Sequence, residues 1–277
     1  MTVFQMPFYF VQEETLEDKK KKWISEHAHE NKRITPDFEP IPGWKPLAEY
    51  GSTPFDILNN RVQAQDFTLI HVGDWIETTV DYTTYRFVFT EFNHYGKNEA
   101  LMVSNRCIAG ETVQYCDSTS GASWMQSKPA RVLNEFGSSL EDSGIHPREM
   151  SIPYSDSQSS MEHVRVTVFS PSIIEACGVQ SYIVESTDDY SQWKCFTSEA
   201  SRSRDNTYWL RSSFKGYANY QPYVDLQGRK SSCSVTSSRG VLPCFCIGGG
   251  KMSKPEPPKP KPEPLPTTPH PDDDDDL

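Results

Sequence analysis

The sequence lacks both long apolar stretches and an excess of positive charge. No uncharged apolar run approaches the roughly 20 residues that are needed to cross a lipid bilayer. The 27 Lys and Arg residues are outnumbered by 38 Asp and Glu residues, which gives a formal net charge of −11. A protein that binds a nucleic-acid backbone or an anionic membrane surface presents a positive field to it. We therefore expect no nucleic-acid partner and no membrane insertion.

A secretory signal is also lacking. Residues 1–10 are apolar and aromatic, but they contain no basic leader and no small-residue cleavage site, and Glu13 and Glu14 follow almost at once. We expect a protein that is made in the cytoplasm. It then either works there or leaves the cell by another route, such as inside a virus particle.

Recognised catalytic and metal-binding motifs are absent. The sequence has no nucleophile elbow, no phosphate-binding loop, no dinucleotide-binding glycine pattern and no zinc-protease helix motif. Seven cysteines are too few for a disulfide scaffold. Cys244 and Cys246 could share one face of a strand, but a metal would need further ligands from elsewhere. We expect buried thiols that act as small hydrophobic groups, with no catalytic residue, metal or cofactor.

One histidine is placed where a catalytic base could stand. His94 follows a predicted strand at the entrance of a loop. Histidines in such positions more often make structural hydrogen bonds than act as general bases, and we predict the structural role.

The residues that are present divide the chain into three compositional zones. Residues 1–50 hold a lysine run and several prolines, and residues 51–250 hold most of the apolar and aromatic residues. Residues 251–277 contain nine prolines and end in five aspartates and a leucine. This last composition cannot bury a core and predicts an extended, mobile acidic tail. We interpret the first zone as a docking arm or connector and the second as the folded domain.

The arm combines one weak helix with a stretch that proline keeps irregular. Residues 13–32 are helix formers with few apolar positions, and we interpret the run Lys19–Lys22 as a solvated face. Four prolines between residues 36 and 46 exclude a regular helix. The segment 41–44 (Ile-Pro-Gly-Trp) is typical of a turn with one aromatic anchor.

Short strands and a few helices alternate in the second zone, which predicts an α+β domain. Thr53 and Pro54 are typical of the N-cap and the first residue of a short helix. Alternating β-branched and aromatic residues on both sides of a polar turn predict a hairpin over residues 72–90. Further predicted strands cover residues 100–103, 164–169, 208–211, 223–225 and 240–247, and further predicted helices cover residues 127–136 and 172–176.

Aromatic residues are abundant, at 12% of the chain, and 13 of them are tyrosines. Several lie between residues 208 and 223 among Ser, Asn, Lys and Arg. Tyr-rich and Ser-rich loops on a rigid sheet are typical of binding surfaces, because a ring gives a large contact area at low entropic cost. We predict that Trp209 belongs to the core and that Tyr217 and Tyr220 are exposed. The candidate ligand-binding residues are Phe214, Tyr217, Asn219 and Tyr220.

Several motifs at characteristic spacing carry a family resemblance. They are Thr53–Ile57, Val72–Asp74, Phe92–His94, Trp124–Ser127 with Arg131–Asn134, and Tyr208–Ser212 with Ser238–Pro243. Over roughly residues 52–247, the sequence resembles an uncharacterised domain of structural proteins from phages and prophages of Gram-positive gut bacteria, which also occurs in some bacterial surface proteins. The family's late motifs are W-W-L-R-S and S-x-G-V-R-P. Two positions depart from its pattern, because Leu242 stands where Arg is usual and Tyr95 where Asp is frequent.

The paired late motifs are also similar to those of C-type-lectin-like and formylglycine-generating-enzyme-like folds. That resemblance implies an α+β domain in which a W-x-R strand and a terminal strand form a core sheet around long loops. Such folds include both ligand-binding phage tips and enzymes, so the fold alone does not fix the function. The calcium-binding triplets of lectins are absent, and residues 221–223 (Gln-Pro-Tyr) lack the acid. Calcium-dependent sugar binding is therefore not implied.

These observations favour a non-enzymatic virion structural or adhesion protein of a phage, located at the tail tip, in a tail fibre or as a capsid decoration. Its arm is expected to contact other virion proteins, and its loops a glycan or protein of the host cell. Assembly into a homo-oligomer is compatible with such a part. Two alternatives stay open. One is an oxidase of the formylglycine-generating type that uses Cys244 and Cys246 with copper, and the other is a bacterial surface binding module whose tail spans the cell wall.

Overall fold

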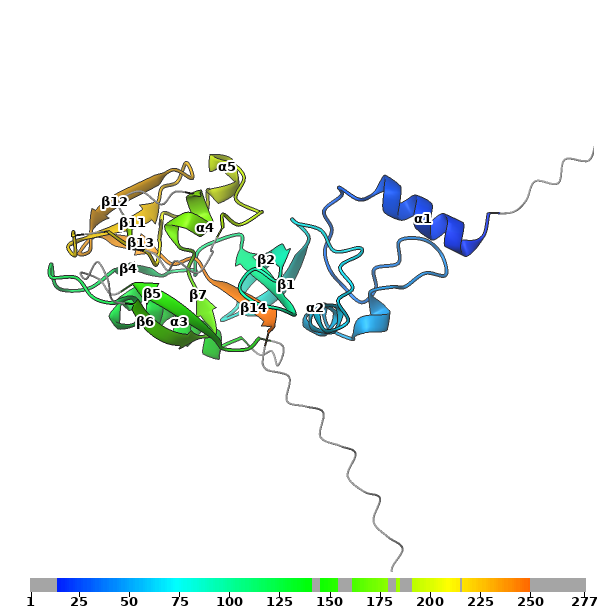
Figure 1. Cartoon of the computed structure of the whole chain (residues 1–277), viewed down its shortest axis with the longest axis horizontal. Coiled ribbons are helices and arrows are strands. Elements are labelled where there is room, and N and C mark those ends of the chain that lie inside the picture. The colour runs from blue at the N-terminus through cyan, green and yellow to red at the C-terminus, as the bar shows by residue number, and fades with distance from the viewer. Residues whose placement is uncertain are drawn as a thin grey trace, which may run out of the picture.

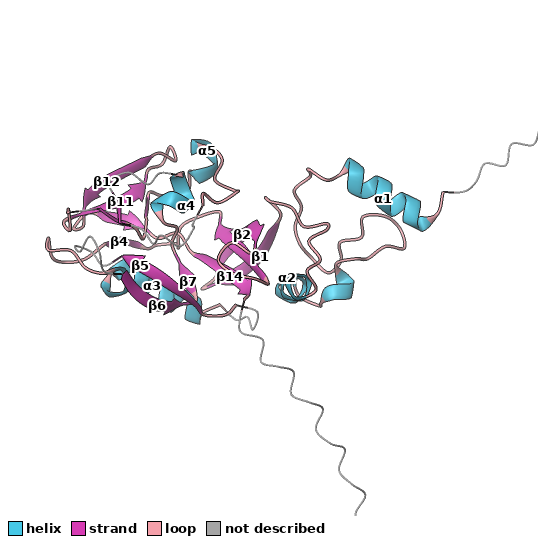
Figure 2. Cartoon of the chain, in the orientation of Figure 1, coloured by secondary structure: helices cyan, strands magenta, loops and turns pink. Residues whose placement is uncertain are grey.

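The computed structural model describes residues 14–140, 145–153, 161–178, 183–184, 191–214 and 216–249. This part of the chain folds into small, mostly antiparallel sheets with a few short helices, as Figure 1 and Figure 2 show. The predicted α+β class is confirmed. The apolar N-terminal residues 1–10 and the proline-rich tail lie outside the described residues. Within the described ranges, no helix has the length and apolar character needed to cross a bilayer.

The first sheet forms the centre of the core. Its order is β1 (Trp75–Val80), β2 (Thr83–Phe92), β3 (Glu99–Ser104), β14 (Cys244–Gly248) and β7 (Val168–Phe169), and every neighbouring pair is antiparallel. Strands β3 and β14 are buried along their whole length. The hairpin predicted from the sequence is confirmed as β1 and β2, which are joined by a turn at Asp81 and Tyr82.

The second sheet consists of shorter strands. Its order is β12 (Lys230–Ser234), β11 (Tyr220–Val224), β9 (Tyr208–Trp209), β13 (Ser238–Gly240) and β4 (Thr112–Gln114). Its pairs are antiparallel except for β13 and β9, which are parallel and meet where Gly240 pairs with Tyr208. Two further pairs lie beside the sheets: β5 (Arg148–Pro153) with β6 (Met161–Val166), and β8 (Ile183–Val184) with β10 (Ser213–Phe214).

Residues 238–248 connect the two sheets, because β13 belongs to the second sheet and β14 to the first. At Gly240 a Cβ atom would lie 2.9 Å from the carbonyl oxygen of Thr207 and 3.1 Å from Sγ of Cys107, so only glycine fits. Leu242 follows as a fully buried side chain. The position at which the resembling family usually has Arg is therefore an apolar core position in this chain.

Local sequence sets the starts of the helices. The hydroxyl of Thr53 accepts a hydrogen bond from the backbone N–H of Asp56 at the start of α2 (Pro54–Gln63), as predicted. Ser127 caps α3 (Lys128–Ser138) in the same way. Ser172 forms a capping box with Glu175 at the start of α4 (Ile173–Cys177). The remaining helices are α1 (Leu16–Glu26), α5 (Glu199–Arg202) and two short 3₁₀ helices, η1 (Ala48–Tyr50) and η2 (Trp124–Gln126).

Aromatic rings fill the space between the first sheet and the helices that cover it. The ring centroid of Phe245 in β14 lies 4.6 Å from that of Phe87 and 6.2 Å from that of Phe55 in α2. Phe136 of α3 packs edge-on against Tyr85 of β2, with 5.1 Å between the centroids. All five rings are buried. These pairs fix α2 and α3 against the sheet.

Helix α1 lies at the opposite end of the molecule from the second sheet (Figure 1), and none of its residues is buried. Its Trp23 packs edge-on against Phe38 and Trp44. Trp44 is buried and closes the predicted turn, because its backbone N–H donates to the carbonyl oxygen of Ile41. The helix is therefore held by a small aromatic cluster of the arm itself.

The later part of the arm packs on the domain. Lys32 Nζ lies 2.6 Å from a carboxylate oxygen of Asp74, which directly precedes β1 and is fully buried. Ile34 and Leu47 are both fully buried and belong to the hydrophobic core. Residues from Lys32 onward are thus part of the packed structure.

Three strand predictions need correction in the same way. The predicted strand 164–169 is divided at Thr167 between β6 and β7, the strand 208–211 ends at Trp209, and residues 241–243 interrupt the strand 240–247. In each case the chain changes or loses its pairing partner within the predicted segment. An alternating or largely apolar sequence therefore predicted one strand where there are two, or where the pairing stops early.

Arg211 and Glu175 form an ion pair inside the core, at the point where the predicted strand stops. Arg211 Nη2 donates to Glu175 Oε1 at 2.6 Å, and Nη1 donates to Oε2 and to the carbonyl oxygen of Ser170. Both side chains are at most 2% exposed. Burial by itself raises the pKa of the Glu175 carboxyl, but the charge and hydrogen bonds of Arg211 outweigh it and the pKa is lowered. The pair stays ionised and fixes α4 against the end of β9.

Replacing one member of this pair should destabilise the domain strongly. We expect Arg211→Met to lower the free energy of unfolding by about 3–5 kcal/mol, because it leaves Glu175 as an unpaired buried charge. Urea unfolding followed by tryptophan fluorescence measures the change. The double variant Arg211→Met with Glu175→Gln should recover part of the loss, since it removes the orphaned charge. A loss below about 1 kcal/mol for Arg211→Met would show that the domain does not depend on the pair.

Candidate functional site

The residues predicted to bind a ligand gather in the connection between β10 and β11. Tyr217 and Tyr220 are 64% and 45% exposed, which confirms that they lie on the surface. Asn219, between them, is exposed as well. Phe214 ends β10, pairs with Ile183 and is only partly exposed. The structure therefore brings the four residues together, with the two tyrosines presenting the most ring surface.

Main-chain hydrogen bonds hold this connection in place. The backbone N–H of Tyr220 donates to the carbonyl oxygen of Tyr217 at 3.1 Å, and Val235 N–H donates to the carbonyl oxygen of Asn219 at 3.1 Å. Tyr220 is also the first paired residue of β11, opposite Ser234. A backbone fixed in this way presents the tyrosine rings at a low entropic cost.

A second loop lies against the first. Gly121 has a φ of +80°, and a Cβ atom there would collide with the carbonyl oxygen of Ala218. Residues 117–120 of this loop are exposed, and the hydroxyls of Ser118 and Ser120 are 2.6 Å apart. We call residues 117–121 and 216–220 the aromatic loop surface. It combines exposed tyrosine rings with serine and asparagine groups that can form hydrogen bonds.

The sheet beneath the aromatic loop surface is rigidly packed. Trp209 is fully buried, as predicted, and its Nε1 donates to the carbonyl oxygen of Val113 at 2.8 Å. The guanidinium of Arg239 lies 4.4 Å from the ring centroid of Tyr223 and 6.0 Å from that of Trp209. Tyr223, in turn, packs edge-on against Trp209. Aromatic and cation–π contacts thus hold together the strands that carry the exposed loops.

His94 is buried in a polar chain. Its Nδ1 lies 3.0 Å from a carboxylate oxygen of Glu91, and its Nε2 accepts a hydrogen bond from Trp193 Nε1 at 3.2 Å. An indole N–H can only donate, so Nε2 is the acceptor in this hydrogen bond. Burial raises the pKa of Glu91, but its contact with His94 outweighs this effect and the pKa is lowered. The arrangement gives His94 the predicted structural role, since the nitrogen that a base would use is occupied by Trp193.

Cys244 and Cys246 lie on β14 and are at most 2% exposed. Their sulfur atoms meet different groups: Cys246 Sγ accepts from Arg148 Nη1 at 2.9 Å, whereas Cys244 contacts the carbonyl oxygen of Leu242. Burial raises the pKa of both thiols, so both stay protonated, whereas the thiolate is the form that binds metals. The part of the chain that the structure describes also has no cluster of three metal-ligating side chains. Nothing in this geometry supports a copper site.

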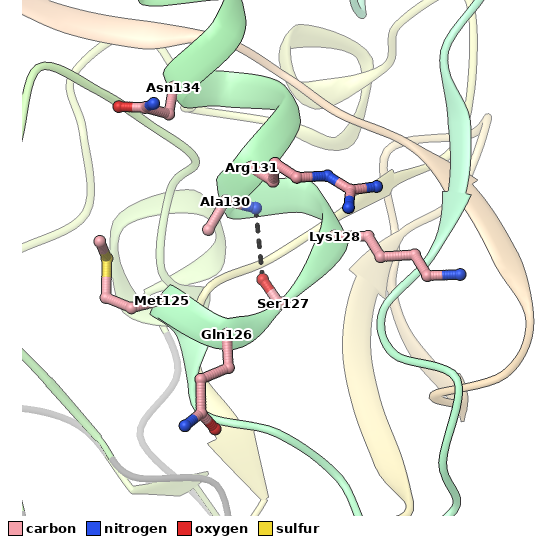
Figure 3. A pocket seen from close by; sticks show the side chains of 7 residues that line it. All are labelled: Met125, Gln126, Ser127, Lys128, Ala130, Arg131 and Asn134. Atoms are coloured by element: carbon pink, nitrogen blue, oxygen red, sulfur yellow. Dashed lines mark hydrogen bonds between the residues drawn. The ribbon is translucent and has the colours of Figure 1, made fainter.

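A pocket of about 390 Å³ lies at the start of α3 (Figure 3). Ser127 Oγ accepts from the backbone N–H of Ala130 and donates to the carbonyl oxygen of Trp124. In Figure 3 the side chains of Lys128 and Arg131 extend to one side of the helix start and those of Met125 and Asn134 to the other, so they do not meet at one point. The motif that lines the pocket therefore builds a helix start and offers no convergent set of groups. The residues that line the pocket are Met125, Gln126, Ser127, Lys128, Ala130, Arg131 and Asn134.

The buried thiols predict how stability depends on pH. Burial raises the pKa of Cys195 to about 11 and that of Cys107 to about 12, from an ordinary value near 9. Above pH 9 the unfolded chain loses these protons while the folded protein keeps them, so rising pH favours unfolding. We expect the free energy of unfolding to fall by about 1 kcal/mol per thiol between about pH 8 and about pH 10. Urea titrations of the wild type and of Cys195→Ala measure the effect. An equally steep fall in the variant would contradict the role of Cys195.

Comparison with known proteins identifies the family. Residues 97–249 match the family model described as "Domain of unknown function (DUF6273)". This region begins just before β3 and ends just after β14, so it leaves out the arm and the β1–β2 hairpin. No curated protein matches, and no solved structure matches. Because the matched residues form more than half of the chain, the protein belongs to the DUF6273 family of domains of unknown function.

Proposed function

We propose that the domain is a non-enzymatic binding module that presents the aromatic loop surface to a glycan or protein on a host cell. The exposure of Tyr217 and Tyr220 on a hydrogen-bonded connection carries this proposal. Exposed aromatic rings that gather on one rigid surface are typical of contact sites, because they bury a large area when a partner binds.

The chemistry around the two rings suits a polar partner. Ser118, Ser120 and Asn219 are exposed beside the tyrosines and supply donors and acceptors. Tyrosine faces can stack on the apolar face of a sugar ring, while hydroxyl and amide groups reach its hydroxyls. The same groups also suit a polar protein surface. The proposal therefore includes a glycan partner and a protein partner, and a glycan array distinguishes between them.

We place this module on a phage particle, as a tail-tip, fibre or head-decoration component with a C-type-lectin-like fold. The motifs of the sequence support this placement, as does the position of Trp209 and Gly240 on neighbouring strands beneath exposed loops. The exposed helix α1, at the opposite end of the molecule, supports the assignment of the arm to contacts with other virion proteins.

Removing both exposed rings should weaken cell binding. We expect Tyr217→Ala with Tyr220→Ala to lower the affinity of the labelled protein for host cells by about tenfold or more, because the rings supply most of the contact area. Binding to a panel of Gram-positive gut bacteria, followed by flow cytometry, measures the change. A glycan array probed with the same two proteins separates sugar partners from protein partners.

The matched control is Tyr82→Ala. Tyr82 is fully exposed, but it lies at the turn between β1 and β2, outside the aromatic loop surface. The control should bind cells as the wild type does. If the double variant and the control bind equally well, the aromatic loop surface is not the contact site.

Deleting residues 1–30 should prevent incorporation into phage particles. This deletion removes the exposed helix α1 but keeps Ile34 and Leu47, which belong to the core. The truncated protein is therefore expected to fold, and circular dichroism checks that it does. Mass spectrometry of purified particles measures incorporation, and a folded variant found at normal copy number would rule out docking through α1.

A further inference from the structure

A cavity of about 820 Å³ lies beside the end of β14. It is lined by α2, by the turn that leads into β3, and by the paired strands β5 and β6. The volume lies within the roughly 300–1,000 Å³ that is usual for small-molecule sites. In Figure 1, α2 and the end of β14 lie away from β11 and β12. The cavity is thus separate from the aromatic loop surface.

Arg148 is held in one orientation at this cavity. Its Nη1 donates to Glu99 Oε2 at 2.8 Å and to Cys246 Sγ at 2.9 Å. Its guanidinium lies 3.9 Å from the ring centroid of Tyr95. Glu99 is itself fixed, because its Oε1 accepts from the backbone N–H groups of Tyr95 and Gly96 at 2.7 and 3.0 Å. The guanidinium is therefore oriented before any ligand arrives, which lowers the entropic cost of binding.

Two buried polar atoms of the cavity walls have no hydrogen-bond partner. They are Nε of Arg148, a donor on β5, and Oδ1 of Asn59, an acceptor on α2. A buried polar group without a partner is unfavourable. A ligand that offers an acceptor to Arg148 and a donor to Asn59 would satisfy both.

The charges of the lining favour an anion. Positive side chains outnumber negative ones by one, and this excess remains when the ion pair of Glu99 and Arg148 is set aside. A guanidinium matches the planar geometry of a carboxylate. The other polar groups suit a ligand with several hydroxyls better than an apolar ligand. The charged residues of the lining are Lys97, Glu99, Arg148, Glu149 and Arg165, and its other polar residues include Asn59, Gln63 and His146.

We propose that this cavity binds an acidic sugar, a hydroxylated ring that carries a carboxylate. The carboxylate accepts hydrogen bonds from Arg148, and a ring hydroxyl donates to Oδ1 of Asn59. This site is additional to the aromatic loop surface and does not rest on the function proposed for that surface.

Calorimetry on the full-length protein tests the proposal. The probes are D-glucuronate and N-acetylneuraminate, with D-glucose and acetate as controls that each lack one of the two features. We expect saturable binding of at least one acidic sugar, and binding about tenfold or more weaker for glucose and acetate. Absence of saturable binding for both acidic sugars overturns the proposal. Equal affinity for acetate and glucuronate also overturns it, because a carboxylate alone would then be recognised.

A peptide is the competing source of a carboxylate. The acidic peptide Pro-Asp-Asp-Asp-Asp-Asp-Leu, which has the sequence of residues 271–277, is titrated under the same conditions. Weaker binding of this peptide than of the acidic sugar supports the proposal. Tighter binding of the peptide overturns the sugar assignment.

Variants locate the site. Arg148→Lys keeps a positive charge opposite Glu99 but removes the Nε donor, and Asn59→Ala removes the acceptor from a partly exposed helix position. We expect affinity to fall about tenfold for Arg148→Lys and severalfold for Asn59→Ala. Asn134→Ala, at an exposed position on α3 outside the cavity, is the matched control and should bind normally.

Two outcomes separate this site from the aromatic loop surface. The variant Tyr217→Ala with Tyr220→Ala should bind the acidic sugar as the wild type does, and its loss of that binding overturns the assignment to the cavity. Wild-type affinity in both Arg148→Lys and Asn59→Ala overturns it as well. If Arg148→Lys fails to fold, Asn59→Ala alone decides.

Discussion

The ion pair between Glu175 and Arg211 is the interaction on which the arrangement of the domain depends. The two oxygens of Glu175 also accept hydrogen bonds from the backbone N–H of Ser172 and the hydroxyl of Tyr95, at 2.9 and 2.7 Å. One carboxylate thus joins the start of α4, the segment after β2 and the end of β9. A buried pair adds little net stability compared with apolar residues of the same volume, but breaking it is costly. It therefore fixes which elements meet.

This role explains the motif that is most typical of the sequence. In the segment Tyr208–Ser212, Trp209 is fully buried, Arg211 pairs with Glu175, and the hydroxyl of Ser212 accepts from Ile173 N–H at 2.7 Å. Arg211 and Ser212 join the end of β9 to α4, and Trp209 packs within the second sheet. These contacts explain the motif by packing alone, and the motif therefore indicates a fold and not a ligand. A resemblance based on such a motif supports a domain type more strongly than a function.

Features that depend on neighbouring residues were predictable from the sequence. The start of α2 follows from Thr53 and Pro54, and the β1–β2 hairpin from alternation around a polar turn. Strand β12, with the sequence Lys-Ser-Ser-Cys-Ser, has no apolar alternation and exists because it pairs with β11. The exposure of Tyr217 and Tyr220 was predictable because Gly, Ala and Asn surround them. The end of β9 was not, because it depends on an ion pair with a distant residue.

The cavity beside β14 was not predictable for the same physical reason. Asn59 and Arg148 lie far apart in the sequence, and only the packing of α2, β5 and β14 brings them to one hollow. The spacing of Ser172 and Glu175 indicates a helix start in the sequence. Nothing near these residues in the sequence indicates that Glu175 pairs with Arg211. A site that is built from long-range contacts can be identified only once the fold is known. A surface that is built on one loop can be predicted from the sequence.

Helix α2 links the arm to the cavity. Asn60 Nδ2 donates to the carbonyl oxygen of Tyr50, and the guanidinium of Arg61 lies 4.5 Å from the ring centroid of Tyr50, while Asn59 faces the cavity. A ligand that binds both Asn59 and Arg148 would therefore stabilise α2, the helix that contacts the arm. A partner on Tyr217 and Tyr220 touches none of these groups, since Tyr220 begins β11 and Tyr217 lies in the connection that precedes it. A ligand in the cavity and a partner on the aromatic loop surface therefore contact different residues.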